Sequence, residues 1–351
     1  MTSYLEDAVK SKMDEANNIE ENEMDLMESQ GDFPIEDAVG QFIPVGVSSV
    51  QNSDISSTYH SAIPKAVLKG FKDPCVLGVD EAGRGPVLGA MVYALSYCLK
   101  SYSDQLKAFG FADSKTLTHE TRMRLFARIC DYDPGNEDKN SKTSNNELFD
   151  NVGYATRTMS ARDISSGMLR SNASGVYNLN EQAHDTTMNL IAEVLEAGVN
   201  VTDIFVDTVG PPDSYQKKLS KRFPRVRFTV TKKADSLFPI VSVASICAKV
   251  TRDVGLMRRE EMISTSKEES WGSGYPGDAR TVKWLKENVD PVFGWSQVVR
   301  FSWQTTKDLL DKDERVRNVE WHDPKAGKLE FKTPKEASTD LWFGSAVSSQ
   351  F

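Results

Sequence analysis

The chain has 351 residues, of which 39% are hydrophobic, and a formal net charge of -9. This length can bury a sizeable core in one large or two modest domains, and no apolar run approaches the roughly 18 residues of a membrane helix. Four cysteines without a C-x-x-C pair and four histidines without HExxH spacing argue against a disulfide scaffold and a zinc hydrolase. An intracellular protein with reduced thiols is the simplest interpretation.

The acidity is concentrated at the N-terminus. Residues 1–40 carry twelve Asp or Glu and two Lys, a net charge of -10, which leaves the rest of the chain at +1. Residues 1–65 are acidic, rich in Ser and Asn and without a sustained apolar period, so they are predicted to form a disordered tail. A near-neutral body is expected to place basic residues on its surface, as a protein that binds the phosphate backbone would.

The rest of the chain alternates between strand and helix signals. The predicted strands are Cys75–Asp80, Ala90–Leu95, Ile204–Asp207 and Val226–Val230. The predicted helices are Thr118–Cys130, Glu181–Glu196 and the small-residue run Pro239–Arg252, and a polar loop is predicted over 131–146. All six tryptophans lie between 271 and 342, so aromatic packing is expected there. The alternation predicts an α/β fold with a mixed sheet flanked by helices.

Two adjacent carboxylates, Asp80 and Glu81, end the first apolar run, and a Gly-Arg-Gly turn follows at 83–85. Ionised groups side by side at the end of a buried strand repel each other unless a cation lies between them, and a hard metal ion is the natural candidate. Because neighbours in a strand point to opposite faces, both acids can reach one site only if the chain turns sharply there. Arg84 offers a fork of donors for a phosphate oxygen. An ordinary turn with solvated acids is the alternative.

The same design recurs at Asp207, which ends an apolar strand and is followed closely by Gly210. Asp235 lies 28 residues further on, between a predicted strand and a predicted helix, where an N-cap role is the alternative. Hard oxygen ligands of this kind select Mg²⁺ or Mn²⁺ over softer ions. The chain has no G-x-S-x-G elbow, which fits a reaction with water as the nucleophile.

Eight segments together resemble one known family. They are DEAGRGPVLG (80–89), DSKTL (113–117), YNLN (177–180), FVDTVG (205–210), KADSLFP (233–239), SICAKVTRD (245–253), GSGYP (272–276) and VRFSW (299–303). On these motifs, residues 70 to 310 resemble type 2 ribonuclease H, in the form of the catalytic chain of the eukaryotic enzyme rather than the shorter bacterial enzyme. The resemblance implies a ribonuclease H-like mixed sheet flanked by helices, with a helical C-terminal extension.

The resemblance also implies the chemistry. The chain would hydrolyse the RNA strand of RNA/DNA hybrids and nick 5′ of single ribonucleotides in duplex DNA, leaving 5′-phosphate and 3′-hydroxyl ends. The catalytic residues would be four metal ligands of a two-metal site for Mg²⁺ or Mn²⁺, namely Asp80, Glu81, Asp207 and Asp235. A non-catalytic nucleic-acid-binding protein of the same fold is the alternative, and the presence of all four acids argues against it.

The remaining site residues are those that would bind substrate. Backbone groups of Gly83, Arg84 and Gly85 would bond to the 2′-hydroxyl. The ring of Tyr275, on a loop expected to be flexible, would stack on the sugar of the next nucleotide, and a core tyrosine is the alternative. The other matching positions are Lys115, Asn178, Arg252 and Thr305, each of which could instead be a solvated surface residue.

The chain is therefore divided into an acidic tail (1–65), a catalytic domain (66–312) and a C-terminal tail (313–351). The last is more apolar than a free tail should be, since it contains Trp321, Leu341 and Trp342, so we expect it to bind a partner. The family implies a heterotrimer with two accessory subunits, B and C, a nuclear location and no membrane association.

Two further patterns have competing interpretations. The glycines after the first strand suggest a dinucleotide-binding turn, but their spacing is G-x-G-x-x-x-G and two acids occupy the place of the pyrophosphate. Lys217, Lys218, Lys221 and Arg222 form a charge run that could be an import signal. Because this run lies within a predicted helix, a solvated helix face is the preferred interpretation.

Overall fold

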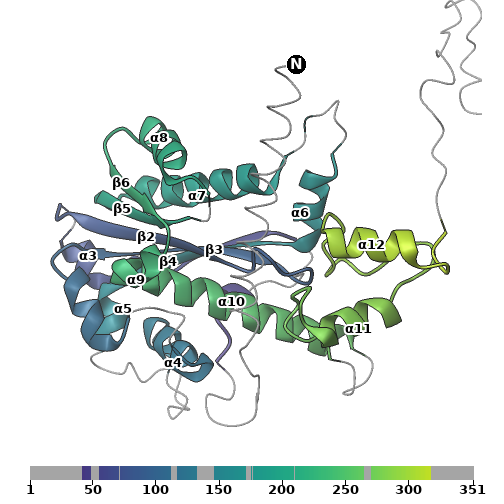
Figure 1. Cartoon of the computed structure of the whole chain (residues 1–351). Coiled ribbons are helices and arrows are strands. Elements are labelled where there is room, and N and C mark those ends of the chain that lie inside the picture. Colours follow the sequence, from purple (N-terminus) through teal and green to yellow (C-terminus); the bar gives the residue numbers. More distant parts are fainter. Residues whose placement is uncertain are drawn as a thin grey trace, which may run out of the picture.

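The computed structural model describes residues 42–48, 55–70, 72–111, 117–132, 146–170, 175, 177–208, 210–264 and 270–317. A six-stranded mixed sheet lies at its centre (Figure 1). The strands are β1 (Ser57–His60), β2 (Cys75–Ala82), β3 (Met91–Leu99), β4 (Gly153–Met159), β5 (Val201–Asp207) and β6 (Arg227–Thr231), in the order β1-β4-β3-β2-β5-β6. β5 runs parallel to both β2 and β6, and the other neighbours are antiparallel. The carboxyl ends of β2, β5 and β6 therefore meet at one edge of the sheet.

Helices cover both faces of the sheet. They are α2 (Val45–Ser48), α3 (Lys65–Lys69), η1 (Ser103–Phe109), α4 (His119–Ile129), α5 (Glu147–Asn151), α6 (Ala161–Met168), α7 (Leu179–Glu196), α8 (Pro212–Arg222), α9 (Ala234–Leu237), α10 (Pro239–Ile263), α11 (Ala279–Glu287) and α12 (Gln304–Lys312). Figure 1 shows α7 and α8 on one face, α4, α5 and α10 on the other, and α11 and α12 beyond one end of the sheet. Each face has its own apolar core, and a third core in the C-terminal part contains Trp271, Trp284 and Trp295.

Helix α10 approaches the sheet unusually closely. A Cβ atom added to Gly78 of β2 would lie 2.5 Å from the backbone of Ile240, so only glycine allows this contact. Ser96 of β3 then donates a hydrogen bond of 2.6 Å to the Ile240 carbonyl. The close approach carries the next turns of α10 along the sheet toward the ends of β2 and β5.

The predicted mixed α/β fold is confirmed, with differences at element ends. The predicted helix over 118–130 is α4, whose N-cap is Thr118, and the predicted buried helix continues past Arg252 to Ile263. No strand was predicted at β4, and the residues predicted as a loop over 131–146 are described only in part. In the described part of the chain, no helix is both long enough and apolar enough to traverse a bilayer.

The predicted boundary of the acidic tail at residue 65 is wrong. Phe42 is buried against Phe126, and β1 pairs with β4 along the whole of its length. These elements are only four residues long, so they show no period in the sequence, and their packing against the domain stabilises them. Residues 1–41, and the C-terminal residues from 318 onward, lie outside the described residues.

Candidate active site

Asp80 lies near the end of β2 and is buried, with 6% of its surface exposed. Its Oδ1 accepts a 2.8 Å hydrogen bond from the Glu81 amide, and its side chain is hydrogen-bonded to Ser245 of α10. The close approach of α10 at Gly78 is what brings Ser245 to this position, because the helix runs over the strand from there. The first predicted carboxylate is thus fixed by both the strand and the helix that covers it.

Glu81 differs from the expectation that the chain turns sharply at the two acids. β2 continues through Ala82, and Glu81 pairs in register with Tyr93 of β3. Asp80 and Glu81 therefore leave opposite faces of the strand, Asp80 toward α10 and Glu81 toward Arg84, whose Nη1 is 3.9 Å from the Glu81 Oε1. The turn begins two residues later than expected, at Gly83.

Asp207 ends β5 and organises the segment that carries Asp235. The Asp207 Oδ1 accepts hydrogen bonds of 3.0 Å from the amides of Thr208 and Ala234, so it ties the end of β5 to the first turn of α9. Asp235 follows within that turn and is buried, with 3% exposed. The N-cap position of α9 is Lys233, which has φ 57° and ψ 39°. The alternative role of Asp235 as an N-cap is therefore wrong.

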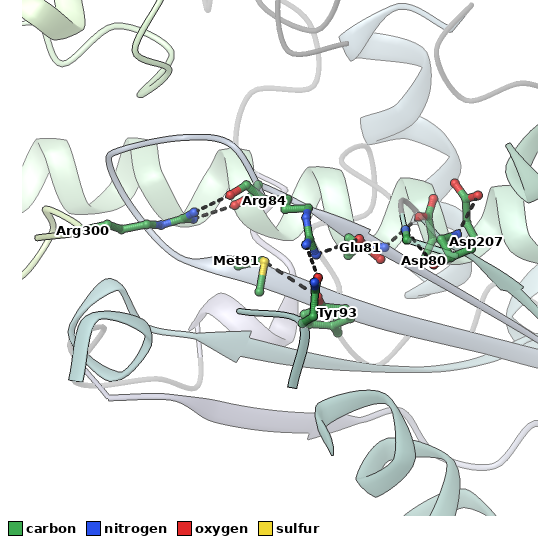
Figure 2. A network of polar contacts seen from close by, with 11 residues as sticks. Asp80, Glu81, Arg84, Met91, Tyr93, Asp207 and Arg300 are labelled. Carbon is green, nitrogen blue, oxygen red and sulfur yellow. Dashed lines mark hydrogen bonds and ion pairs between the residues drawn. The ribbon is translucent and has the colours of Figure 1, made fainter. Parts of the chain in front are cut away.

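The electrostatics of Asp80 show that these carboxylates lie close together. Burial, first of all, raises the pKa of Asp80 well above 3.8. The charges of Asp207, Glu81 and Asp235 raise this pKa further, whereas the hydrogen bond with Ser245 lowers it. Figure 2 shows Asp80, Glu81 and Asp207 gathered at the end of their strands. The sheet edge predicted from the sequence thus brings the carboxylates together.

This donor set suits a divalent cation. Carboxylate oxygens are hard ligands, and a cation among them would relieve the repulsion that raises the pKa of Asp80. Within the described residues, no three Asp, Glu, His or Cys side chains already form a coordination shell. The site therefore fits such an ion by charge and donor type, and binding would require side-chain rotation.

The turn after β2 is held from a distant part of the chain. Arg300 is fully buried, and its guanidinium donates to the carbonyls of Gly83 at 2.6 Å, Arg84 at 3.0 Å and Gly89 at 2.9 Å. Figure 2 shows this side chain directed at the backbone of the turn. A guanidinium is the only side chain that offers several donors in one plane, so three carbonyls are fixed by one residue.

Two more contacts complete the hold on this turn. Trp303 donates its indole N–H to the Gly85 carbonyl at 2.8 Å and lies 4.7 Å from the Arg300 guanidinium, measured to the ring centroid. Gly83 has φ 79°, and a Cβ there would lie 2.9 Å from the Ala90 carbonyl oxygen. Glycine is therefore required at this position by both conformation and space.

The Arg84 side chain turns back onto the protein. It donates to Asn180 at the start of α7, approaches Glu81, and is hydrogen-bonded to the hydroxyl of Tyr93, as Figure 2 shows for the last two. Tyr93 is buried, and burial followed by the charge of Glu81 raises the pKa of its phenol. The guanidinium expected to offer its fork to a phosphate thus already has three protein partners.

Arg252 is buried rather than solvated. Its Nη2 donates to the Ser273 carbonyl at 2.7 Å and its Nη1 pairs with Asp253 at 2.9 Å. The guanidinium also lies over the ring of Tyr275, 5.4 Å from the centroid. A Cβ on Gly83 would lie 3.1 Å from the Arg252 Cγ, so this side chain packs between the turn and the GSGYP loop.

The GSGYP loop, expected to be flexible, is held by hydrogen bonds. The Ser273 amide donates to Asp278 at 2.7 Å, and the Gly274 amide donates to Thr281 at 3.0 Å. Tyr275 itself is 6% exposed. A ring this deeply buried can offer only its edge to a ligand.

The other predicted substrate-binding residues have different surroundings. Asn178 is the N-cap of α7, where its side chain accepts from the Glu181 amide in a capping box. Thr305 is half-buried in the first turn of α12, two residues after Trp303. Lys115 lies outside the described residues. The structure thus places Asn178 and Thr305 beside the turn at 83–85 through their neighbours Asn180 and Trp303.

Sequence reasoning missed four residues that hold the site, namely Ser245, Arg300, Trp303 and Asn180. All four lie within the eight motifs, so the motifs carried the signal. Their roles could not be assigned because each acts through a contact with a residue far away in the sequence.

Comparisons with known proteins agree with this geometry. The family model for ribonuclease HII matches residues 77–306. The catalytic-type relative from Schizosaccharomyces pombe, the A chain of its ribonuclease H2, is 50% identical over 87% of this chain and 89% of its own length. The corresponding A chain of ribonuclease H2 from Homo sapiens is 47% identical over 72% of this chain and 77% of its own length.

Solved structures agree as well. The crystal structure of ribonuclease H2 from Pyrococcus horikoshii has a TM-score of 0.51 and 27% identity, over 67% of this chain and 96% of that protein. The ribonuclease HII in a complex with PCNA from Archaeoglobus fulgidus has the same TM-score and 26% identity, with the same coverage. Because the family model spans more than half of the chain and the ribonuclease H2 relatives align over most of it, the chain belongs to the ribonuclease HII family, among the A chains of eukaryotic ribonuclease H2.

Proposed function

We propose that this chain hydrolyses the RNA strand of RNA/DNA hybrids and nicks duplex DNA 5′ of single embedded ribonucleotides, leaving 5′-phosphate and 3′-hydroxyl ends. The observation that carries the proposal is the gathering of four carboxylates at one sheet edge, beside a rigid glycine turn, in a chain 50% identical to the A chain of a ribonuclease H2. Membership of this family makes the chain an endoribonuclease.

The four carboxylates, Asp80, Glu81, Asp207 and Asp235, are proposed as catalytic residues and as ligands of Mg²⁺ or Mn²⁺. Two such ions would supply an activated water and stabilise the negative charge on the leaving 3′-oxygen. Asp80 is held in place for this role by Ser245 and by the Glu81 amide. Asp207 holds the first turn of α9 through its Oδ1, so the position of Asp235 depends on Asp207.

The turn at 83–85 is proposed to recognise the ribose. Its carbonyls point to Arg300 and Trp303, which leaves the opposite edge of the turn, where the amides of Gly83 and Gly85 lie, toward a ligand. A 2′-hydroxyl can both donate and accept, and no side chain on Gly83 blocks its approach. Tyr275, Lys115, Asn178, Arg252 and Thr305 complete the proposed substrate-binding set.

The experiment that tests the function compares three substrates. The full-length chain, together with any subunits that co-purify with it, is incubated with an RNA/DNA hybrid, a DNA duplex containing one ribonucleotide, and plain DNA, each with Mg²⁺, with Mn²⁺ and with a chelator. We expect cleavage of the first two only, and only with metal. Cleavage of plain DNA, or none of any substrate, would contradict the proposal.

The chain is also proposed to work in the nucleus as the catalytic member of a heterotrimer with two accessory subunits, B and C. The segment from 313 onward supports this, because its described start packs against the C-terminal core through Val316 while Trp321, Leu341 and Trp342 follow. Removing residues 318–351 is expected to leave the catalytic domain folded and to reduce recovery of partner subunits in a pull-down. Full recovery by the shortened chain would contradict the partner role of this segment.

A further inference from the structure

Helices α7 and α8 carry a second group of polar side chains that the proposed reaction does not use. His184 of α7 is half-buried and stacks on Tyr215 of α8, with ring centroids 3.9 Å apart and an angle of 18° between the planes. The His184 Nδ1 lies 3.5 Å from the Nζ of Lys218, one turn further along α8. Stacking fixes the plane of the imidazole, so both of its nitrogens are confined to the edge that meets Lys218 and the solvent.

This group is continuous with the turn proposed to hold the ribose. Asn180, which receives the Arg84 guanidinium, is four residues before His184, so the two side chains lie on the same face of α7. The charge of Arg84 acts on His184, because it contributes to lowering the pKa of the imidazole, after burial and Lys218. Arg84, Asn180, His184 and Lys218 thus form a row of polar groups from the turn across α7 to α8.

The balance of charge along this row is positive at its outer end. Lys218 has one carboxylate neighbour in the described structure, Asp185 at 3.9 Å, and Asp185 also accepts a 2.8 Å hydrogen bond from the hydroxyl of Tyr177. The Lys218 ammonium is closer to the neutral imidazole than to this carboxylate. An ammonium whose nearest partner is a neutral ring is an unusually good position for an added anion.

The chemistry of the substrate identifies that anion. Every ribose in a nucleic-acid strand is flanked by phosphates, so a strand whose 2′-hydroxyl lies at residues 83–85 extends its phosphates away from the turn. We propose that His184 and Lys218 form a binding site for a backbone phosphate of the substrate, which extends the nucleic-acid surface from the Gly83–Gly85 turn onto α7 and α8. This inference rests on the proposed function of the turn.

The neighbouring residue Lys217 provides a matched control. Lys217 and Lys218 are adjacent on α8 and both are exposed, but successive residues of a helix point about 100° apart, so only Lys218 reaches His184. Replacing either lysine by glutamine removes one positive charge from the same helix. A difference between the two variants therefore reports the position of the charge and not its number.

The test measures affinity without cleavage. The full-length chain, with any co-purifying subunits, binds a fluorescent RNA/DNA hybrid in chelator over a series of salt concentrations. We expect Lys218→Gln to weaken binding about 3- to 10-fold and to reduce the slope of log affinity against log salt by about one, with Lys217→Gln close to the parent and Lys218→Arg restoring affinity. Equal affinities and slopes for the two glutamine variants would overturn the proposal.

A second variant separates phosphate binding from packing. His184→Phe keeps an aromatic ring stacked on Tyr215 but removes both ring nitrogens, so we expect weaker hybrid binding, by about 2- to 5-fold, with an unchanged melting temperature. Loss of melting temperature without loss of affinity would mean that His184 only packs the two helices, and would overturn its part. If the parent chain itself neither binds nor cleaves the hybrid, the proposed function fails, which is a different result from a parent that binds and variants that bind equally well.

Discussion

The two halves of the active site are built in opposite ways. On the turn at 83–85, each backbone carbonyl has a donor, from Arg300 or Trp303, and the glycine conformation fits the space. At the strand ends, a buried carboxylate has three further carboxylates around it, which raise its pKa. The turn is fully satisfied by the protein alone, whereas the carboxylate edge is satisfied only by a cation. A rigid half can select a substrate, and a repulsive half can hold metal ions.

This contrast predicts the largest effect at the carboxylates. Asp207→Asn is expected to lower cleavage of the RNA/DNA hybrid more than about 100-fold while hybrid affinity changes less than about threefold, because the carboxylate acts on metal ions and basic groups hold the phosphates. Cleavage rate and affinity are measured separately. Asp203→Asn, on the same strand but paired with Lys100 and Arg227, is the control and should cleave normally. A near-normal rate for Asp207→Asn with Mg²⁺ would refute the assignment.

The rigid half is broken most directly at Arg300. Arg300→Lys keeps the charge but loses the planar fork that holds three carbonyls, so we expect unfolding free energy to fall by about 2–4 kcal/mol and cleavage to fall about 10- to 100-fold. Urea denaturation and kcat/KM are the measurements. Arg227→Lys, an exposed surface arginine, should change neither. Wild-type stability of Arg300→Lys would show that the turn does not depend on this residue.

Tyr275→Ala sharpens the comparison between substrates. Its proposed contact is to the deoxynucleotide after the ribose, so cleavage at a single ribonucleotide in DNA should fall several-fold more than cleavage of a continuous hybrid. Because the ring is buried beside Arg252, the variant should also lose about 3 kcal/mol of stability, and the assays belong at a temperature where it is folded. Equal losses on both substrates would favour a role in packing alone.

The smallest effect concerns stability at the repulsive half. In the folded chain the pKa of Asp80 is raised, so the folded state binds more protons than the unfolded state and stability falls as pH rises from about 4 through the folded pKa. Asp80→Asn removes this charge, and we expect it to be more stable than the parent by about 1–2 kcal/mol at pH 7 in chelator. Thermal melts at pH 4.5 and 7, with and without Mg²⁺, measure this. A less stable variant at pH 7 in chelator would contradict the stored repulsion.

The sequence predicted the carboxylate half well, for a simple physical reason. Asp80 and Asp207 each follow an apolar run, and parallel strands bring their carboxyl ends to one edge, so local pattern and topology together locate the acids. The turn residues were found in the same way, since glycines mark places where the chain must bend.

The supporting residues could not be found in this way. Arg300 contacts carbonyls up to 217 residues earlier, and nothing around it in the sequence indicates those partners. Arg252 was expected at the surface, as arginines usually are, but Ser273, Asp253 and the ring of Tyr275 together make its burial favourable. The order of residues 42–60 depends on packing of Phe42 and pairing of β1, which local composition does not reveal.

The long reach of Arg300 has a consequence for the synthesis of the enzyme. A ribosome makes all four carboxylates well before it makes Arg300 and Trp303, so a nascent or prematurely terminated chain holds the acids without the residues that shape the turn. Such a fragment would lack the ordered turn through which a ribose is told from a deoxyribose. The order of translation therefore completes substrate selection last, after the C-terminal core has folded.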